Sequence, residues 1–312
     1  MQANYRAVTF SEYGAPEVLQ VVERPLPVPG AGEVRLAVRA AGVNPLDWKI
    51  RSGAAASFLP VEFPVVPGGD VAGVVDAVGP GVTGFAVGDE VLGSIGFGGY
   101  AEAVVVSAGT LTRKPASVPW ETAAALPVAA NTALHALDEL KLRDGETIVI
   151  DGAAGGVGTV AVQLAVLRGA RVVGTAREAN HAYLRSLGAT PVEYGTGLAD
   201  RVRSVAPEGV DAVLDASGRG SLPALIEVAG GPDRVVTIAD FSAAGLGVRM
   251  ISADAEGAGR RIGEAAALAA EGKLTVPIAA TYSLQEAAEA HRASEQGHVR
   301  GKLVIVPDGK AD

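Results

Sequence analysis

Hydrophobic and polar positions in the first third of the chain follow the pattern of short β-strands. Val34, Leu36 and Val38 alternate with mostly charged neighbours, as in a half-buried strand. Residues 71–78 and 101–106 are further short apolar runs, and Gly and Pro separate these segments densely. Short strands divided by such turns predict a β-rich domain with the character of a barrel.

The pattern changes near Trp120. Residues 121–140 are rich in Ala and Leu, with a proline at position 127, and predict one or two helices. From Thr147 onward, short apolar strands alternate with segments of helical spacing. The expected strands are residues 147–151, 171–175, 191–194, 210–216 and 234–239, and the expected helices are residues 157–165, 179–187, 198–206 and 222–229. Repeated βα units predict a parallel, doubly wound sheet.

The end of the chain returns to short strands. Residues 256–271 predict an alanine-rich helix, and the tail from Leu274 ends in an apolar strand at 302–306. We expect this tail to join the first domain. Residues 1–120 and 274–312 would then form the β-rich domain, and residues 121–273 would form an inserted Rossmann domain, which gives an α/β fold.

A glycine-rich segment lies between an expected strand and an expected helix. Glycines let the backbone approach a pyrophosphate, and a helix N-terminus offers N–H groups with partial positive charge. A turn that merely connects the two elements is the alternative. The strand, the spacing, the helix and the following βα units together favour a dinucleotide site. The residues expected at the pyrophosphate are Gly152, Ala153, Ala154, Gly155, Gly156, Val157 and Gly158.

The end of the next expected strand indicates which dinucleotide binds. NAD enzymes usually place an acid about 20 residues beyond the glycines, to accept from the ribose 2′-OH. This chain has Thr175 and Arg177 there, and the first acid is Glu178. A guanidinium suits the 2′-phosphate of NADP, and a solvated surface arginine is the alternative. Tyr194, at the end of the following strand, either borders the adenosine phosphate or packs on the sheet. We therefore expect NADPH as the cofactor.

Composition and charge exclude several classes of protein. The chain has 312 residues and a net charge of −9, whereas a nucleic-acid binder needs a basic surface. It has no cysteine, which excludes disulfides, thiolate nucleophiles and cysteine-ligated zinc. No uncharged apolar run approaches the roughly 18 residues needed to cross a bilayer. The first six residues lack an apolar signal core, so we expect a cytoplasmic protein without membrane partners.

Several ordered segments carry a resemblance to a known family. They are residues 41–53, 63–73, 87–91, the glycine-rich segment and residues 300–304. With these segments the chain resembles the medium-chain dehydrogenase/reductases, most of all their zinc-free quinone oxidoreductase branch, the group related to zeta-crystallin. The resemblance covers nearly the whole chain. It implies a GroES-like β-barrel domain, an inserted Rossmann domain and, usually, a homodimer.

The same comparison indicates that no metal takes part. Zinc alcohol dehydrogenases resemble this chain but place Cys near Asn44 and His-Glu near Gly69 and Asp70, where this chain has neither Cys nor His. The four histidines lie in helical or tail segments without the spacing of a zinc site. The sequence therefore predicts hydride transfer without zinc.

Candidate catalytic residues follow from the resemblance. Asn44 matches the zinc-cysteine position; its amide donates to a substrate or nicotinamide oxygen, or it simply starts a turn. Asp47 either orients its neighbours or caps the short helix that follows. Lys49 stands where relatives often have tyrosine; it contacts the cofactor ribose, supplies positive charge to a developing enolate, or is solvated. Thr132 resembles a threonine that meets the nicotinamide edge. Tyr100 lies near the cleft or packs within its strand.

Two further segments are expected at the cofactor. Ile238, Ala239 and Phe241 follow an expected strand, and ligands bind at the carboxyl edge of such sheets. Lys302 matches a tail residue that approaches the cofactor in relatives. The expected substrates are quinones or α,β-unsaturated carbonyl compounds. An enoyl reductase of a biosynthetic pathway, or an NADPH-binding sensor or structural protein with little turnover, are the alternatives.

Overall fold

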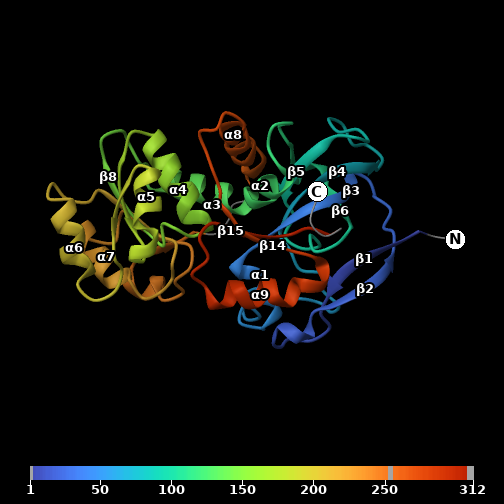
Figure 1. The fold of residues 1–312 in the computed structure, drawn as a ribbon, viewed down its shortest axis with the longest axis horizontal. Helices are drawn as coiled ribbons and strands as arrows, with labels where there is room; N and C mark the ends of the chain where they lie inside the picture. Colours follow the sequence, from blue (N-terminus) through green and yellow to red (C-terminus); the bar gives the residue numbers. More distant parts are fainter. Residues whose placement is uncertain (1–2, 252–255, 308–312) are drawn as a thin grey trace. The chain divides into compact units, whose positions relative to one another are not determined.

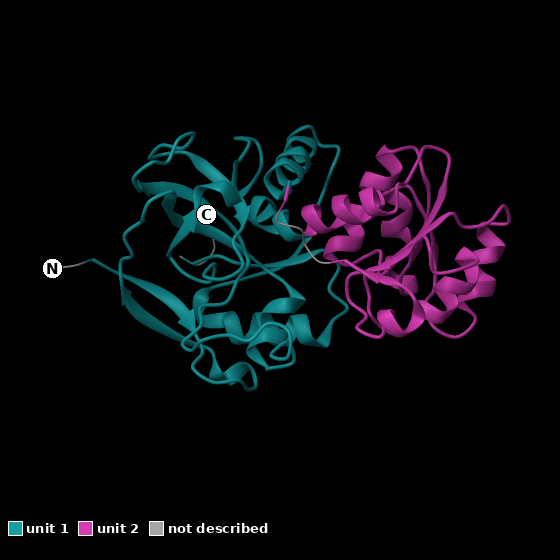
Figure 2. Ribbon diagram, turned by 180° about the vertical axis from the view of Figure 1, so that it is seen from behind, with its two compact units in different colours: residues 1–128, 257–312 teal, residues 129–256 magenta. Residues whose placement is uncertain are grey.

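The computed structural model of the chain describes residues 3–251 and 256–307 (Figure 1). The chain forms two compact units: unit 1 comprises residues 1–128 and 257–312, and unit 2 comprises residues 129–256 (Figure 2). The sequence placed the divisions after residues 120 and 273. The difference at the second division is helix α8 (Ala258–Ala270), which contacts β5 and β7 of unit 1.

Unit 1 is built on a seven-stranded sheet in which only β14 and β15 run parallel to each other. The strands follow the order β14-β15-β3-β4-β5-β7, and β6 pairs with β3. Their bounds are β3 (Glu33–Val43), β4 (Asp70–Val78), β5 (Glu90–Ser94), β6 (Ala103–Ser107), β7 (Leu111–Arg113), β14 (Ile278–Tyr282) and β15 (Lys302–Ile305). A separate antiparallel hairpin consists of β1 (Asn4–Thr9) and β2 (Gln20–Pro25). The last strands of the chain thus extend a sheet that begins near its start.

Strand β3 shows how the sequence pattern becomes a core. Val34, Leu36 and Val38 are buried, as their alternation predicts, and Arg35 and Ala37 between them are more exposed. From residue 40 to the end of the strand every residue is buried, because helix α2 (Trp120–Ala125) packs on β3 and β4. Gly42 permits this approach, since a Cβ there would overlap the Ala124 carbonyl oxygen.

Two more helices and three short 3-10 helices complete the regular structure in the described part of unit 1. Helix α1 (Pro45–Arg51) follows β3 directly, and helix α9 (Ala287–Gln296) contacts α1, β14 and β15. Figure 1 shows α9 running alongside α1 beneath these strands. The short 3-10 helices are η1 (Pro16–Val18), η2 (Ala108–Thr110) and η5 (Leu284–Glu286).

Unit 2 contains a six-stranded parallel sheet with the order β10-β9-β8-β11-β12-β13. The strands are β8 (Thr147–Asp151), β9 (Arg171–Thr175), β10 (Ala189–Val192), β11 (Ala212–Asp215), β12 (Val235–Thr237) and β13 (Arg249–Met250). Counted from β8, this is the order 3-2-1-4-5-6 of dinucleotide-binding domains. The order reverses between β8 and β11, and ligands bind beyond the carboxyl ends of the strands at such a reversal. The predicted doubly wound sheet is confirmed.

The helices of this part of the chain are α3 (Pro127–Glu139), α4 (Gly156–Leu167), α5 (His181–Ser186), α6 (Leu198–Val205) and α7 (Leu222–Ala229), with η3 (Glu178–Asn180) and η4 (Ala243–Leu246). Among the helices of the described residues, none is both long and apolar enough to span a bilayer. Three predicted strands ran too far: β10 stops at Val192, β11 at Asp215 and β12 at Thr237. Tyr194 lies in the loop after β10. The carbonyls of residues 193–196 bind the Arg201 side chain instead of continuing the sheet.

Candidate functional site

The glycine-rich loop lies at the carboxyl end of β8, at the reversal of strand order. It is tied to β9: the Gly152 N–H donates to Thr175 Oγ1 at 3.0 Å, and the Ala153 N–H donates to the Thr175 carbonyl at 3.1 Å. Gly155 is the N-cap of α4 and has no side chain that could accept from the N–H groups of the first turn. The loop can therefore present these N–H groups to an anion.

Two glycines of the loop serve different purposes. A Cβ at Gly158 would overlap the Gly152 carbonyl and lie 2.7 Å from Ala153 Cα, so the loop itself requires this glycine. A Cβ at Gly155 would lie 3.4 Å from the Gly152 carbonyl oxygen, an ordinary contact, and its φ of −75° suits any residue. The protein alone tolerates a Cβ at Gly155, which makes this position a probe for a ligand.

Buried carboxyl groups stand at the ends of β8 and β11. Asp151 and Asp215 are register partners, and Ser217 Oγ lies 2.5 Å from an Asp151 oxygen and 3.1 Å from an Asp215 oxygen. A hydroxyl has one proton, so it donates to one carboxylate only. Burial raises the pKa of Asp151, and the charge of Asp215 raises it further, against hydrogen bonds from Ser217 and Thr175 that lower it. Neither acid was predicted as a site residue, although Asp151 ends a predicted strand and Asp215 is the last but one residue of another.

The loop after β12 carries three predicted cofactor residues. The Ile238 N–H donates to the Asp215 carbonyl at 3.0 Å, and the Ala239 N–H donates to Thr237 Oγ1 at 3.1 Å. Thr237 in turn donates to an Asp215 carboxylate oxygen at 2.8 Å. Phe241 follows with 58% of its side chain exposed. The structure thus places these residues at the carboxyl edge of the sheet, where they were expected.

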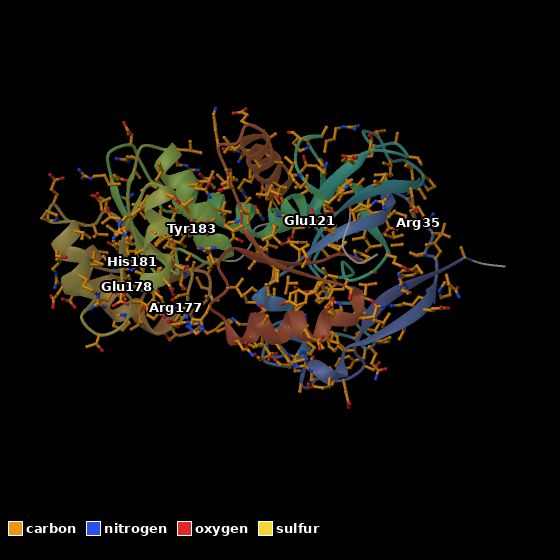
Figure 3. All side chains as sticks on the ribbon, viewed as in Figure 1. Arg35, Glu121, Arg177, Glu178, His181 and Tyr183 are labelled. Atoms are coloured by element: carbon orange, nitrogen blue, oxygen red, sulfur yellow. The ribbon has the colours of Figure 1, made fainter. Side chains whose placement is uncertain are left out.

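Arg177 and Tyr194 follow the ends of the neighbouring strands β9 and β10, at the same edge of the sheet. Thr175 and Val192 are register partners in β9 and β10, and the Ala176 N–H donates to the Val192 carbonyl at 3.0 Å. Arg177 and Tyr194 each lie two residues beyond that pair, and both are exposed. Figure 3 shows Arg177 next to Glu178 where η3 begins, with His181 and Tyr183 further along the same part of unit 2.

In unit 1, Asn44 and Asp47 form the start of α1. Asn44 is the N-cap, and its backbone N–H donates to Asp47 Oδ2 at 2.8 Å. The hydroxyl of Tyr100 donates to the same oxygen at 2.9 Å. Asp47 therefore caps the helix, which was one of its two predicted roles, and Tyr100 is buried within this contact.

The side-chain amide of Asn44 lies between a carboxylate and an ammonium group. Its Nδ2 donates to Asp70 Oδ2 at 2.9 Å, and Lys302 Nζ donates to its Oδ1 at 2.5 Å. Lys302 Nζ also lies 3.4 Å from Asp70 Oδ2, and Asp70 Oδ1 accepts from the Val128 N–H at 2.9 Å. The opposite charges determine which end of the amide faces which partner. We call Asn44, Asp47, Asp70, Tyr100 and Lys302 the polar cluster of unit 1.

Burial dominates the electrostatics of the polar cluster. It raises the pKa of Asp47 to about 6, against the hydrogen bonds from Asn44 and Tyr100 that lower it, while the charge of Asp70 raises it. Burial also raises the pKa of Asp70, and the neighbouring Lys302 ammonium opposes this. The pKa of Tyr100 is raised by burial and by Asp47. Two carboxyl groups thus share one buried ammonium.

The remaining predicted residues lie as follows. Lys49 is half-buried, its Nζ lies 5.8 Å from the centre of the Trp48 ring, and burial lowers its pKa. Thr132 is buried on α3. Asp70 was not predicted as a site residue, although the comparison with zinc enzymes had singled out its position. Its partner Lys302 is 232 residues away in the sequence, so no local pattern could have joined the two.

The donor set of the described residues does not suit a metal ion. Across 3–251 and 256–307, no three His, Asp or Glu side chains are grouped so that they could hold one, and the chain has no cysteine. At the positions compared above with zinc ligands, an amide oxygen and a carboxylate oxygen both face the Lys302 ammonium.

Comparisons with known proteins agree with this architecture. The sequence model described as "Alcohol dehydrogenase GroES-like domain" matches residues 30–116, and that described as "Zinc-binding dehydrogenase" matches residues 187–305. The chain is 35% identical to "Quinone-oxidoreductase QR1, chloroplastic" of Triphysaria versicolor, over 97% of this chain and 98% of the relative. It is 31% identical to the human "Quinone oxidoreductase", over 96% of this chain and 97% of the relative.

Solved structures give the same result. The quinone oxidoreductase from Coxiella burnetii matches with a TM-score of 0.82 and 32% identity, over 97% of this chain and 99% of that one. The fold and the sequence together therefore place the chain in the medium-chain dehydrogenase/reductase superfamily, within its quinone oxidoreductase family. It is an oxidoreductase of that family, whose members bind a nicotinamide cofactor.

The raised pKa of Asp47 predicts a pH-dependent stability. The folded-state pKa of about 6 exceeds the ordinary 3.8. The protonated Asp47 carboxyl therefore contributes to the stability of the folded state, fully below pH 3.8, and this contribution is lost as pH rises through 6. From pH 4.5 to 7 this group alone should lower the free energy of unfolding by about 2 kcal/mol. Urea unfolding of wild type and Asp47→Asn should show that the variant lacks this decrease. Equal pH slopes in both proteins would contradict the assignment.

Proposed function

We propose that this chain reduces quinones or α,β-unsaturated carbonyl compounds with NADPH, by direct hydride transfer and without zinc. The observation that carries the proposal is the glycine-rich loop at the reversal of strand order, with a guanidinium at the end of β9 where NAD enzymes usually have a carboxylate. Two relatives that match over nearly their whole length are called quinone oxidoreductases, which supports the substrate class. That the chain acts as a homodimer stays a prediction.

Unit 2 supplies the residues that hold the nucleotide. The first N–H groups of α4 bind the diphosphate, and Arg177 pairs with the 2′-phosphate. A charge-assisted hydrogen bond contributes roughly 1.5–3 kcal/mol, which means about tenfold to a hundredfold discrimination against NADH. Tyr194 borders the adenosine phosphate from the neighbouring loop. Thr132, Ile238, Ala239 and Phe241 flank the nicotinamide, whose chemistry when bound is to supply a hydride.

The polar cluster of unit 1 supplies a hydrogen-bond donor for the substrate. Quinones and enones accept hydride without metal polarisation, but the negative charge that forms on their oxygen needs hydrogen-bond donors. Lys302 donates to Asn44 Oδ1, so Asn44 Nδ2 faces Asp70 and donates one N–H to it. The second N–H of Nδ2 would then donate to an oxygen of the substrate or nicotinamide. Lys49, in the last turn of α1, adds a second cation. The proton that completes the reduction comes from solvent.

Enoyl reduction in a biosynthetic pathway is the second candidate. One observation favours it: 90% of this chain matches a segment of "Pikromycin polyketide synthase component PikAII" from Streptomyces venezuelae, with 34% identity over 300 residues. That segment is 8% of the much longer relative. The same nucleotide site would serve both reactions, so only the substrate distinguishes them.

Steady-state oxidation of NADPH, followed by its absorbance, tests the proposal with a panel of quinones, enones and enoyl thioesters. We expect saturable turnover with quinones or simple enones that a metal chelator leaves unchanged. Turnover confined to enoyl thioesters would favour the second candidate. Tight NADPH binding without turnover would indicate a sensor or structural protein, and chelator-sensitive activity restored by zinc would contradict the metal-free reaction.

Arg177→Met should remove the preference for the phosphorylated cofactor. We expect the KM for NADPH to rise about tenfold to a hundredfold, since one charge-assisted contact is lost, while the KM for NADH changes little. The matched control is Arg185→Met, which removes an exposed arginine from α5. If Arg177→Met keeps the wild-type ratio of the two KM values, the 2′-phosphate is bound elsewhere.

Gly155→Val should block the nucleotide and spare the fold. The added Cβ makes only an ordinary contact within the protein. The side chain projects from the N-cap toward the diphosphate, so the Kd for NADPH should rise at least about tenfold, or about 1.4 kcal/mol. Calorimetric titration and thermal unfolding measure the two effects. Gly245→Ala in η4, where a Cβ meets nothing within 4 Å, is the control. Unchanged affinity in a folded Gly155→Val protein would remove the loop from the site.

A further inference from the structure

The Arg201 side chain binds four consecutive backbone carbonyls. Its Nε donates to the Glu193 oxygen at 2.9 Å and its Nη1 to the Thr196 oxygen at 2.8 Å. Its Nη2 donates to the oxygens of Tyr194 and Gly195 at 3.1 and 3.2 Å. Four of the five N–H groups of this guanidinium are thus committed to one loop, residues 193–196, which we call the Tyr194 loop.

The loop needs such a partner because its carbonyls converge. It connects the end of β10 to α6 within a few residues, and Gly195 and Gly197 both have positive φ, of 89° and 77°. Four carbonyl oxygens that face one point repel one another unless donors lie between them. A planar guanidinium offers its donors in a fixed fork that reaches all four, whereas an ammonium is a point charge with three donors. Arg201 therefore determines the shape of this loop.

In the proposed function, the Tyr194 loop borders the adenosine phosphate that Arg177 binds. Tyr194 is 40% exposed, and it leaves the sheet edge beside Arg177, each two residues beyond the register pair of β9 and β10. A change in the path of the loop would move Tyr194 relative to Arg177. The separation of these two side chains determines whether a 2′-phosphate fits between them.

We propose that Arg201 is a positioning residue for cofactor specificity: it holds the Tyr194 loop in the conformation that accepts the 2′-phosphate beside Arg177. This inference rests on the proposed NADPH site. Arg201 acts through its fork of hydrogen bonds to backbone rather than through its charge. Its effect therefore passes through Tyr194, and a lysine at this position cannot replace it.

The test is calorimetric titration with two fragments that differ in the 2′-phosphate, 2′,5′-ADP and 5′-AMP. We expect wild type to bind 2′,5′-ADP more tightly than 5′-AMP. The ratio of the two affinities should fall about tenfold, or by about 1.4 kcal/mol, in Arg201→Lys and in Arg201→Met. Arg203→Met is the matched control, because Arg203 lies on the same helix, is exposed and pairs with Asp200 and Glu227. It should keep the wild-type ratio.

A double-mutant cycle with Tyr194→Ala locates the effect. If Arg201 acts through the loop, Arg201→Lys should change the ratio little further once Tyr194 is removed. Thermal unfolding of each variant, measured alongside, separates a loss of specificity from a loss of the folded structure. A wild-type ratio in Arg201→Lys, or an undiminished effect in the Tyr194→Ala background, would overturn the positioning role. Equal affinity of wild type for both fragments would instead contradict the proposed NADPH site.

Discussion

The contact of the Lys302 ammonium with Asn44 and Asp70 is the interaction on which unit 1 depends. It joins the end of β3, the start of β4 and the start of β15, so that the last strand of the chain is fixed to two of the first. Removing one partner of a buried ion pair typically costs about 3–5 kcal/mol, because the other charge is left unpaired. Loss of any one of these three side chains should therefore destabilise the sheet where the three strand ends meet.

The same contact distinguishes the side chains at these positions from the Cys and His expected in zinc dehydrogenases. Where those enzymes are expected to hold a dication, Lys302 provides a single positive charge that is covalently part of the protein. One ammonium neutralises one of the two buried carboxylates, which is consistent with the raised pKa of Asp47 and of Asp70. In the proposed function, that charge polarises the Asn44 amide, and a substrate that is already electrophilic needs no stronger Lewis acid.

The sequence was most informative where local pattern decides the structure. The βα alternation of unit 2 was predicted because buried parallel strands are short apolar runs, and the cap at Asp47 was predicted because capping acts over one helical turn. Tyr194 was assigned to a strand wrongly, since a side chain seven residues further on shapes its loop. The partners of Lys302 could not be predicted, because periodicity identifies buried positions but does not pair polar groups across 258 residues. Asp151 and Asp215 had a local signal, an acid at a strand end, but nothing in the sequence showed that they share Ser217.

The central claim is that hydride passes from the nicotinamide to a quinone or enone in a protein whose buried cation is an amine and not a metal. The most direct measurement is single-turnover oxidation of NADPH that carries deuterium at C4, with metal-stripped protein and an accepted substrate. We expect that oxidation persists without metal and that deuterium slows it. With an enone as substrate, the label should also appear at the carbon that accepts the hydride, whereas a hydroquinone O–D would exchange with solvent. Loss of all oxidation on metal removal, with recovery on addition of zinc, would contradict it.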